Sequence, residues 1–126
     1  MIRGTTAQFK FKLPYEFDSL SAIKITFWQP GNDNQRLPIT KVGTDCSAAT
    51  DDPYSLCVSL TSEETMRFSD KYKARVQLRA THNNAVFASR QQLITVYPIH
   101  DEVLDPEIPD PDTDGWVILD GEQISG

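Results

Sequence analysis

Hydrophobic and polar residues alternate along most of the first hundred positions of the chain. Alternation with a period of two is typical of β-strands that bury one face and expose the other. It is clearest over residues 7–13 and 72–80, and shorter versions occupy 23–28, 37–42 and 54–60. In the two clearest strands, the alternation predicts which side chains face the core. They are Ala7, Phe9, Phe11, Leu13, Tyr72, Ala74, Val76, Leu78 and Ala80.

Prolines and one capping signal mark where these strands end. Pro14 ends the first strand, and Pro38 indicates that 37–42 is an edge strand, because proline cannot donate to a ladder. Thr61 and Glu64 have the spacing of a capping box, which predicts a short helix running towards Phe68. We expect Met66 and Phe68 to close one end of the core.

The last strand-like segment, residues 86–97, changes its inward face partway along. Phe87 and Leu93 share one parity, whereas Ile94 and Val96 take the other. A β-bulge, or burial on both faces, would explain the change.

Together these elements predict an all-β protein. We expect an antiparallel, immunoglobulin-like β-sandwich of six to seven strands with one short connecting helix. The sandwich domain spans residues 1–100, and residues 101–126 form an extended C-terminal arm. No βαβ unit and no internal repeat is evident in the sequence.

The distribution of charge separates the two parts. Residues 1–100 carry 12 Lys and Arg against 9 Asp and Glu, whereas residues 101–126 carry 9 acidic residues and no basic one. Nucleic-acid phosphate would repel such an arm. Because the chain also lacks 18 consecutive apolar residues, we expect neither a nucleic acid nor a membrane as its partner.

The C-terminal arm combines a stiff acidic stretch with an apolar end. Residues before proline favour extended backbone, so the prolines around Ile108 predict a spacer. An apolar tip that remains exposed lowers solubility unless it docks. We therefore expect the arm to add a strand to the sheet edge of a neighbouring subunit or another protein. The partner-binding residues are Ile108, Trp116, Val117, Ile118 and Leu119.

A row of basic residues faces outward from the strand at 72–80. This basic row consists of Lys73, Arg75 and Arg79, and Lys10 and Lys12 extend outward from another strand. A solvated sheet face is the ordinary interpretation of such a row. The alternative is a docking surface for an acidic segment, which the arm of the same or a neighbouring copy would supply.

Candidate chemistry in the sequence is sparse. His82 falls in a turn and His100 at the junction with the arm, and no catalytic or phosphate-binding motif accompanies them. Asp45, Asp51 and Asp52 share a loop but lack the spacing of an EF-hand, and their Asp-Asp-Pro sequence is common in turns. We therefore expect no enzyme activity, no bound metal and no cofactor.

Two cysteines, Cys46 and Cys57, flank a turn-rich stretch. They could face each other across a hairpin, but two reduced thiols, one of them buried, are the expected state of an intracellular product. No CxxC or Cys/His spacing indicates zinc.

Several stretches resemble small proteins encoded in the structural-gene clusters of phages of gut bacteria. They are the opening MIRGTT with its strand ending in LP, DCSAATDDPYSLCVSLTSEET, RVQLRAT followed by a turn and AVFAS, and DEVL ending at Leu104. The resemblance covers residues 1–104 and carries no catalytic motif. It implies an accessory structural protein of the virion, assembled in the host cytoplasm. Its expected partners are capsid, fibre or tail subunits and further copies of itself.

The sequence leaves the place in the particle and one other class of function open. Attachment to the head, as a decoration or head-fibre protein, is the first expectation, and a tail or baseplate adaptor is its alternative. A carbohydrate- or host-surface-binding module is the alternative from another class, with Trp28 and Tyr15 as its aromatic residues. Two aromatic side chains in one groove would favour it.

Overall fold

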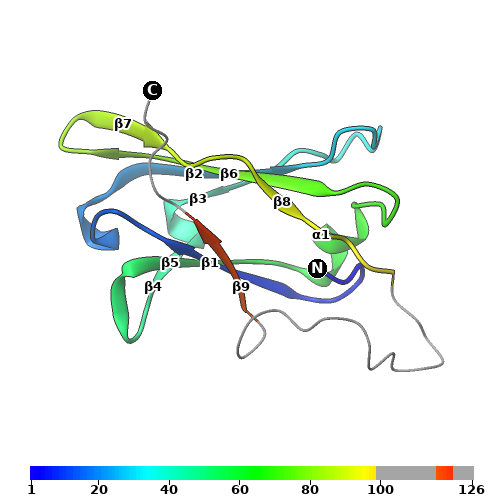
Figure 1. Cartoon of the computed structure of the whole chain (residues 1–126), viewed down its shortest axis with the longest axis horizontal. Helices are drawn as coiled ribbons and strands as arrows, with labels where there is room; N and C mark the ends of the chain where they lie inside the picture. Colours follow the sequence, from blue (N-terminus) through cyan, green and yellow to red (C-terminus); the bar gives the residue numbers. More distant parts are fainter. Residues whose placement is uncertain (99–115, 121–126) are drawn as a thin grey trace.

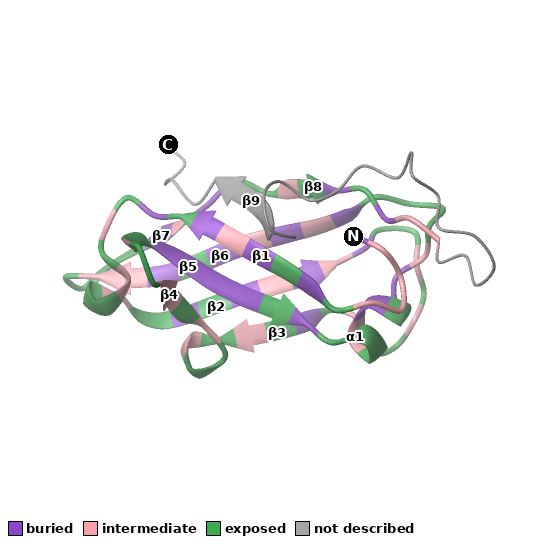
Figure 2. Cartoon of the chain, turned by 90° about the horizontal axis from the view of Figure 1, so that it is seen from below, coloured by how far each residue is buried: buried purple, intermediate pink, exposed green. Residues whose placement is uncertain are grey.

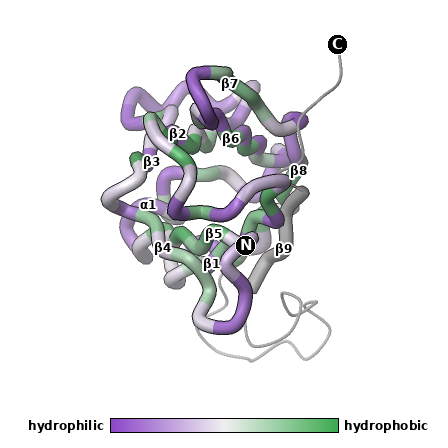
Figure 3. The backbone as a smooth tube through the Cα atoms, turned by 90° about the vertical axis from the view of Figure 1, so that its left-hand side faces the viewer, coloured by the Kyte–Doolittle hydropathy of each residue, from purple (hydrophilic) through white to green (hydrophobic). Residues whose placement is uncertain are grey.

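The computed structural model describes residues 1–98 and the backbone of residues 116–120. It consists of two β-sheets that face each other, seen from the side in Figure 1 and nearly end-on in Figure 3. The strands are β1 (Ala7–Lys12), β2 (Ser21–Trp28), β3 (Ile39–Val42), β4 (Ser47–Ala49), β5 (Asp52–Leu60), β6 (Ala74–His82), β7 (Ala85–Ala88), β8 (Gln92–Ile94) and β9 (Trp116–Asp120). The helical segments are α1 (Ser62–Met66) and two 3-10 turns, η1 (Phe17–Ser19) and η2 (Gly43–Asp45).

Sheet topology places the strands in two layers. The first sheet has the order β4-β5-β1-β9, and the second has the order β3-β2-β6-β7, with β8 also paired to β6. All pairs of named strands are antiparallel except β1 with β9, which is parallel. The all-β class predicted from the alternation is confirmed. The described residues form nine strands instead of six or seven, because β4 was missed, 86–97 divides in two, and β9 joins the first sheet.

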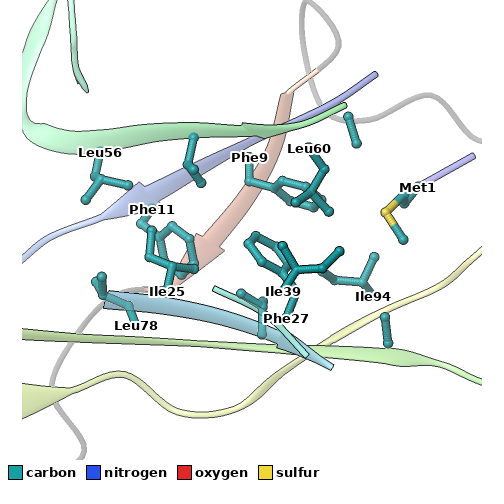
Figure 4. Close-up of a cluster of buried hydrophobic side chains, with 14 of the residues drawn as sticks. Met1, Phe9, Phe11, Ile25, Phe27, Ile39, Leu56, Leu60, Leu78 and Ile94 are labelled. Atoms are coloured by element: carbon teal, nitrogen blue, oxygen red, sulfur yellow. The ribbon is translucent and has the colours of Figure 1, made fainter. Parts of the chain in front are cut away.

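The hydrophobic core lies between the two sheets. Phe9 and Phe11 of β1 and Phe27 of β2 are fully buried, and the Phe9 and Phe27 rings meet at 5.1 Å between centroids. Figure 4 shows these rings between the layers, with aliphatic side chains from both sheets around them. Buried and more exposed residues alternate along β1 in Figure 2, as the sequence predicts for a half-buried strand.

The helix signal is confirmed in detail. The Thr61 hydroxyl accepts a hydrogen bond from the Glu64 amide at 3.1 Å, and Glu64 Oε1 accepts from the Thr61 amide at 2.9 Å. Burial raises the pKa of Glu64, but its bonds to Thr61 and Lys41 outweigh that effect and hold the pKa below its usual value. Phe68 closes the core as predicted, whereas Met66 is exposed, so that part of the prediction is wrong.

Ser89 explains the change of face in residues 86–97. Its side chain is fully buried, its amide donates to the Leu78 carbonyl at 2.8 Å, and its hydroxyl accepts from the Leu78 amide at 3.0 Å. The chain therefore leaves the β7 register at Ser89 and pairs with β6 again as β8. Ile94 is buried and Leu93 is exposed, which corrects the inward parity first assigned to Leu93.

Of two other predicted strand boundaries, one is confirmed and one is wrong. β3 begins after Pro38 and forms an edge of the second sheet, as predicted. The strand expected from Tyr72 begins instead at Ala74, and the Tyr72 side chain is 46% exposed, so its inward position is wrong. Its ring lies against Gly31, whose φ of +91° suits a residue without a side chain.

Candidate docking edge

In the first sheet β1 lies between β5 and β9, and β9 is the last strand on that side. Five residue pairs are in register, from Gln8 with Trp116 to Lys12 with Asp120. The other side of β1 is occupied by β5, from Ala7 with Leu60 to Lys12 with Ser55. We call the side of Ala7–Lys12 that pairs with β9 the docking edge; β9 is drawn in red next to β1 in Figure 1.

The register matches the chemistry of the two strands. Val117 pairs with Phe9 and Leu119 with Phe11, so two aliphatic positions are opposite two core positions. Lys12 pairs with Asp120, which are of opposite charge. Opposite charges directly across a ladder favour a pairing, whereas a slip of one residue would exchange the two faces. The sequence of β9 is therefore suited to this one register.

Strand formation by the end of the arm was predicted, with the sheet edge of a neighbouring subunit or another protein as its acceptor. Trp116, Val117, Ile118 and Leu119 form a strand at a sheet edge, and that edge belongs to the same chain. A partner chain as the acceptor stays a prediction. Ile108 lies outside the described residues, as does His100.

The basic row and the lysines of β1 do not form one surface. Arg75 and Arg79 belong to β6 in the second sheet, and Lys73 immediately precedes that strand, whereas Lys10 and Lys12 belong to β1 in the first sheet. Lys10 and Lys12 therefore do not extend the basic row across one sheet face. Arg75 is half-buried and donates to Gln91 at 3.2 Å, which suits the ordinary interpretation of a solvated sheet face. Docking of an acidic segment on the basic row stays a prediction.

A cluster around His82 was not predicted from the sequence. The His82 ring stacks on Tyr15 with 3.8 Å between centroids, and the Tyr15 ring meets Phe87 edge-on at 5.5 Å. Asn83 Nδ2 lies 3.2 Å from His82 Nε2, and Ser19 Oγ lies 3.2 Å from His82 Nδ1. No local pattern joins Tyr15 to His82, because Tyr15 follows β1 of the first sheet and His82 ends β6 of the second, so they meet only when the two sheets pack together.

The hydrogen bonds of this cluster argue for a structural role. Asn83 can only donate through Nδ2, so its contact with His82 suits a ring tautomer in which Nε2 accepts. Ser19 donates its own proton to the Glu16 carbonyl at 2.6 Å, so its hydroxyl accepts from His82. A nucleophilic serine needs the opposite arrangement, with its proton directed at an accepting histidine nitrogen.

The two aromatic residues of the sugar-binding alternative are far apart. Trp28 pairs with Arg75 at the beginning of β6, whereas Tyr15 stacks on His82 at its end. Seven residues of extended strand separate these positions by about 23 Å. Trp28 and Tyr15 therefore do not line one groove, so this pair gives no support to sugar binding.

Other hollows and acidic groups give no stronger site. An apolar hollow of about 640 Å³ is lined by η1, the start of β2 and the Val42–Thr44 segment. Asp45 accepts from the Val42 amide and Asp52 from Tyr54 and Ser55, so these carboxylates serve local turns. Within residues 1–98 and 116–120, no group of three or more metal-ligating side chains comes together. Nor does that part of the chain contain a helix long and apolar enough to cross a membrane.

The two cysteines are free thiols, Cys57 buried and Cys46 partly so. They lie near each other because Ser47, which follows Cys46, pairs with Cys57 in the β4–β5 hairpin. Burial, with a smaller contribution from Asp45, raises the pKa of the Cys46 thiol to about 11.

We expect Cys46 to react slowly with iodoacetamide. At pH 8 a thiol with this pKa is about one-thousandth thiolate, so alkylation should be roughly 10- to 100-fold slower than for an unperturbed cysteine. The measurement is the alkylation rate of a Cys57→Ala variant, followed by mass spectrometry, with the same variant in urea as the control. Equal rates in the folded and unfolded protein would contradict the raised pKa.

No protein-family model matches the chain, and comparison with curated proteins and with solved structures also finds no significant match. The observations that bear on function are therefore the sequence itself and the pairing of β9 with the docking edge.

Proposed function

We propose that the chain is a non-enzymatic structural protein of a phage particle, an immunoglobulin-like β-sandwich that attaches to or bridges larger virion proteins through its C-terminal arm. Attachment on the head, as a decoration or head-fibre protein, is the preferred place, with a tail or baseplate adaptor as the alternative. The observation that supports an assembly role most is the pairing of β9 with β1. The phage assignment comes from the resemblance of residues 1–104.

Strand addition provides an economical means of attachment. Main-chain hydrogen bonds along a sheet edge supply affinity, and side chains at alternate positions supply selectivity. The arm carries such a strand at the end of an acidic, proline-containing stretch, so the strand and the domain are separated by a spacer. A strand on a spacer is the design expected of a tether.

Removal of the arm tests this proposal in assembled virions. A chain ending at Leu104 lacks β9. Its amount in purified particles should fall at least tenfold, because its sandwich retains no strand to add to a partner. A chain ending at Gly121 keeps Trp116–Asp120 and should be incorporated like the full chain. Quantitative mass spectrometry of purified particles measures both. Normal incorporation of the chain ending at Leu104 would refute the tether.

A further inference from the structure

The connection into β9 is longer than the strand arrangement requires. Tyr97 bridges Ile2 in parallel, an offset of 95 residues, whereas Trp116 pairs with Gln8 in parallel, an offset of 108. A chain that simply continued along this edge would reach Gln8 thirteen residues earlier. The sequence therefore places thirteen more residues between Tyr97 and Trp116 than between their parallel partners Ile2 and Gln8.

The composition of this connection favours a long reach. Residues 98–115 include seven acidic residues, no Lys or Arg and four prolines. An extended chain of these eighteen residues spans about 55 Å. Six residues span at most about 20 Å when fully extended, and the turn at Arg3 and Gly4 makes the distance from Ile2 to Gln8 shorter still. Mutual repulsion and proline both disfavour the compact return that pairing within one chain requires.

The docking edge would be an open edge without β9. Ala7–Lys12 contains no proline or glycine, and it alternates core residues with polar ones along its whole length. Native proteins usually protect such an edge, since its unpaired amides and carbonyls accept a strand from any chain that fits. Every copy of this protein offers the same edge, and β9 already matches its register.

We propose that β9 of one copy completes the docking edge of a second copy, and that the two copies exchange this strand reciprocally. The contacts are those of the pairing within one chain, including Lys12 with Asp120, so exchange needs no new interface. The thirteen additional residues supply the reach to the second copy. This inference rests on the proposed function, because it names the first partner of the tether as another copy of the chain.

The exchange predicts a crosslink between two chains that each carry one cysteine. One chain carries Lys12→Cys, and the other, lengthened by a tag, carries Asp120→Cys; both also carry Cys46→Ser and Cys57→Ala. The chains are mixed in urea, refolded together at high concentration and treated with a short bis-maleimide. We expect a product with the summed mass of the two chains, because positions 12 and 120 meet across the exchanged strand.

Two comparisons make the result decisive. Lys24→Cys lies on β2 of the other sheet, is exposed, and should give no mixed product with Asp120→Cys. A single chain with both Lys12→Cys and Asp120→Cys reports pairing within one chain. If that variant forms a crosslink within one chain under the same conditions while the mixed pair gives no product, β9 adds to β1 but the proposed exchange between copies is wrong. If neither links, the pairing itself is wrong. Only the virion experiment tests the phage role.

Discussion

Replacing Phe9 with alanine should lower the free energy of unfolding by about 3–5 kcal/mol. The ring is fully buried and packs against Phe27 across the two sheets, so its removal leaves a cavity that the sandwich cannot fill by a local shift. Phe9 also pairs with Val58 on one side and Val117 on the other, so the cavity lies beneath a strand that is paired on both sides. Urea denaturation followed by circular dichroism measures the change.

Val86→Ala is the matched control for this substitution. Val86 also belongs to a strand, but 60% of its surface is exposed, and its truncation should change the free energy of unfolding by no more than about 0.5 kcal/mol. If Phe9→Ala lost no more stability than Val86→Ala, the core described between the two sheets would be wrong.

Gln29→Leu should also have a large effect, lowering the free energy of unfolding by about 2–4 kcal/mol. Gln29 is buried, and its side chain joins two loops: Nε2 donates to the carbonyls of Ser69 at 2.6 Å and Tyr72 at 2.7 Å. Oε1 accepts from the Ser69 amide and from Asn32 Nδ2, each at 2.7 Å. Leucine keeps the bulk but leaves these partners unsatisfied, and a buried polar group without a partner costs about 1–3 kcal/mol.

Two further substitutions separate hydrogen bonding from packing at this site. Gln29→Glu keeps the shape and the two accepted bonds, but it turns a carboxylate oxygen towards two carbonyls, so we expect it to be destabilising as well. Gln91→Leu, at an exposed position whose side chain bonds Arg75, should have a small effect. Thermal unfolding of all three variants gives the comparison, and wild-type stability of Gln29→Glu would show that the bonds contribute little.

The sequence predicted correctly those elements whose formation depends on residues that are close together in the chain. The alternation in Ala7–Lys12 and the capping box at Thr61 each depend on residues within a few positions, and both elements were found where expected. The inward position predicted for Tyr72 was wrong. Its parity matches the core residues of β6, but it lies before the strand begins, against Gly31. The face change at Ser89 was visible in the sequence, but its cause, a hydroxyl paired with Leu78 of β6, was not.

The acceptor of β9 depends on a pairing that no local signal specifies. Trp116–Asp120 pairs with a strand more than a hundred residues earlier, and parallel pairing carries no turn signal because the two strands are not joined by a hairpin. The sequence therefore indicates a strand that will add to an edge, without indicating which edge. The stack of Tyr15 on His82 escaped prediction for the same reason, because the two residues meet only after β1 and β6 are assembled.

Amide hydrogen exchange of Ala7–Lys12 is the most direct test of whether the end of the arm adds a strand to β1. The comparison is between the full chain and an Ile118→Pro variant, since proline in the middle of β9 removes a donor and prevents a regular ladder. Gln123→Pro, beyond β9, is the matched control. We expect the β1 amides that point towards β9 to exchange at least tenfold faster in Ile118→Pro, while the β1 amides that point towards β5 and those of β2 and β6 are unchanged. Equal protection of β1 in all three proteins would contradict this pairing.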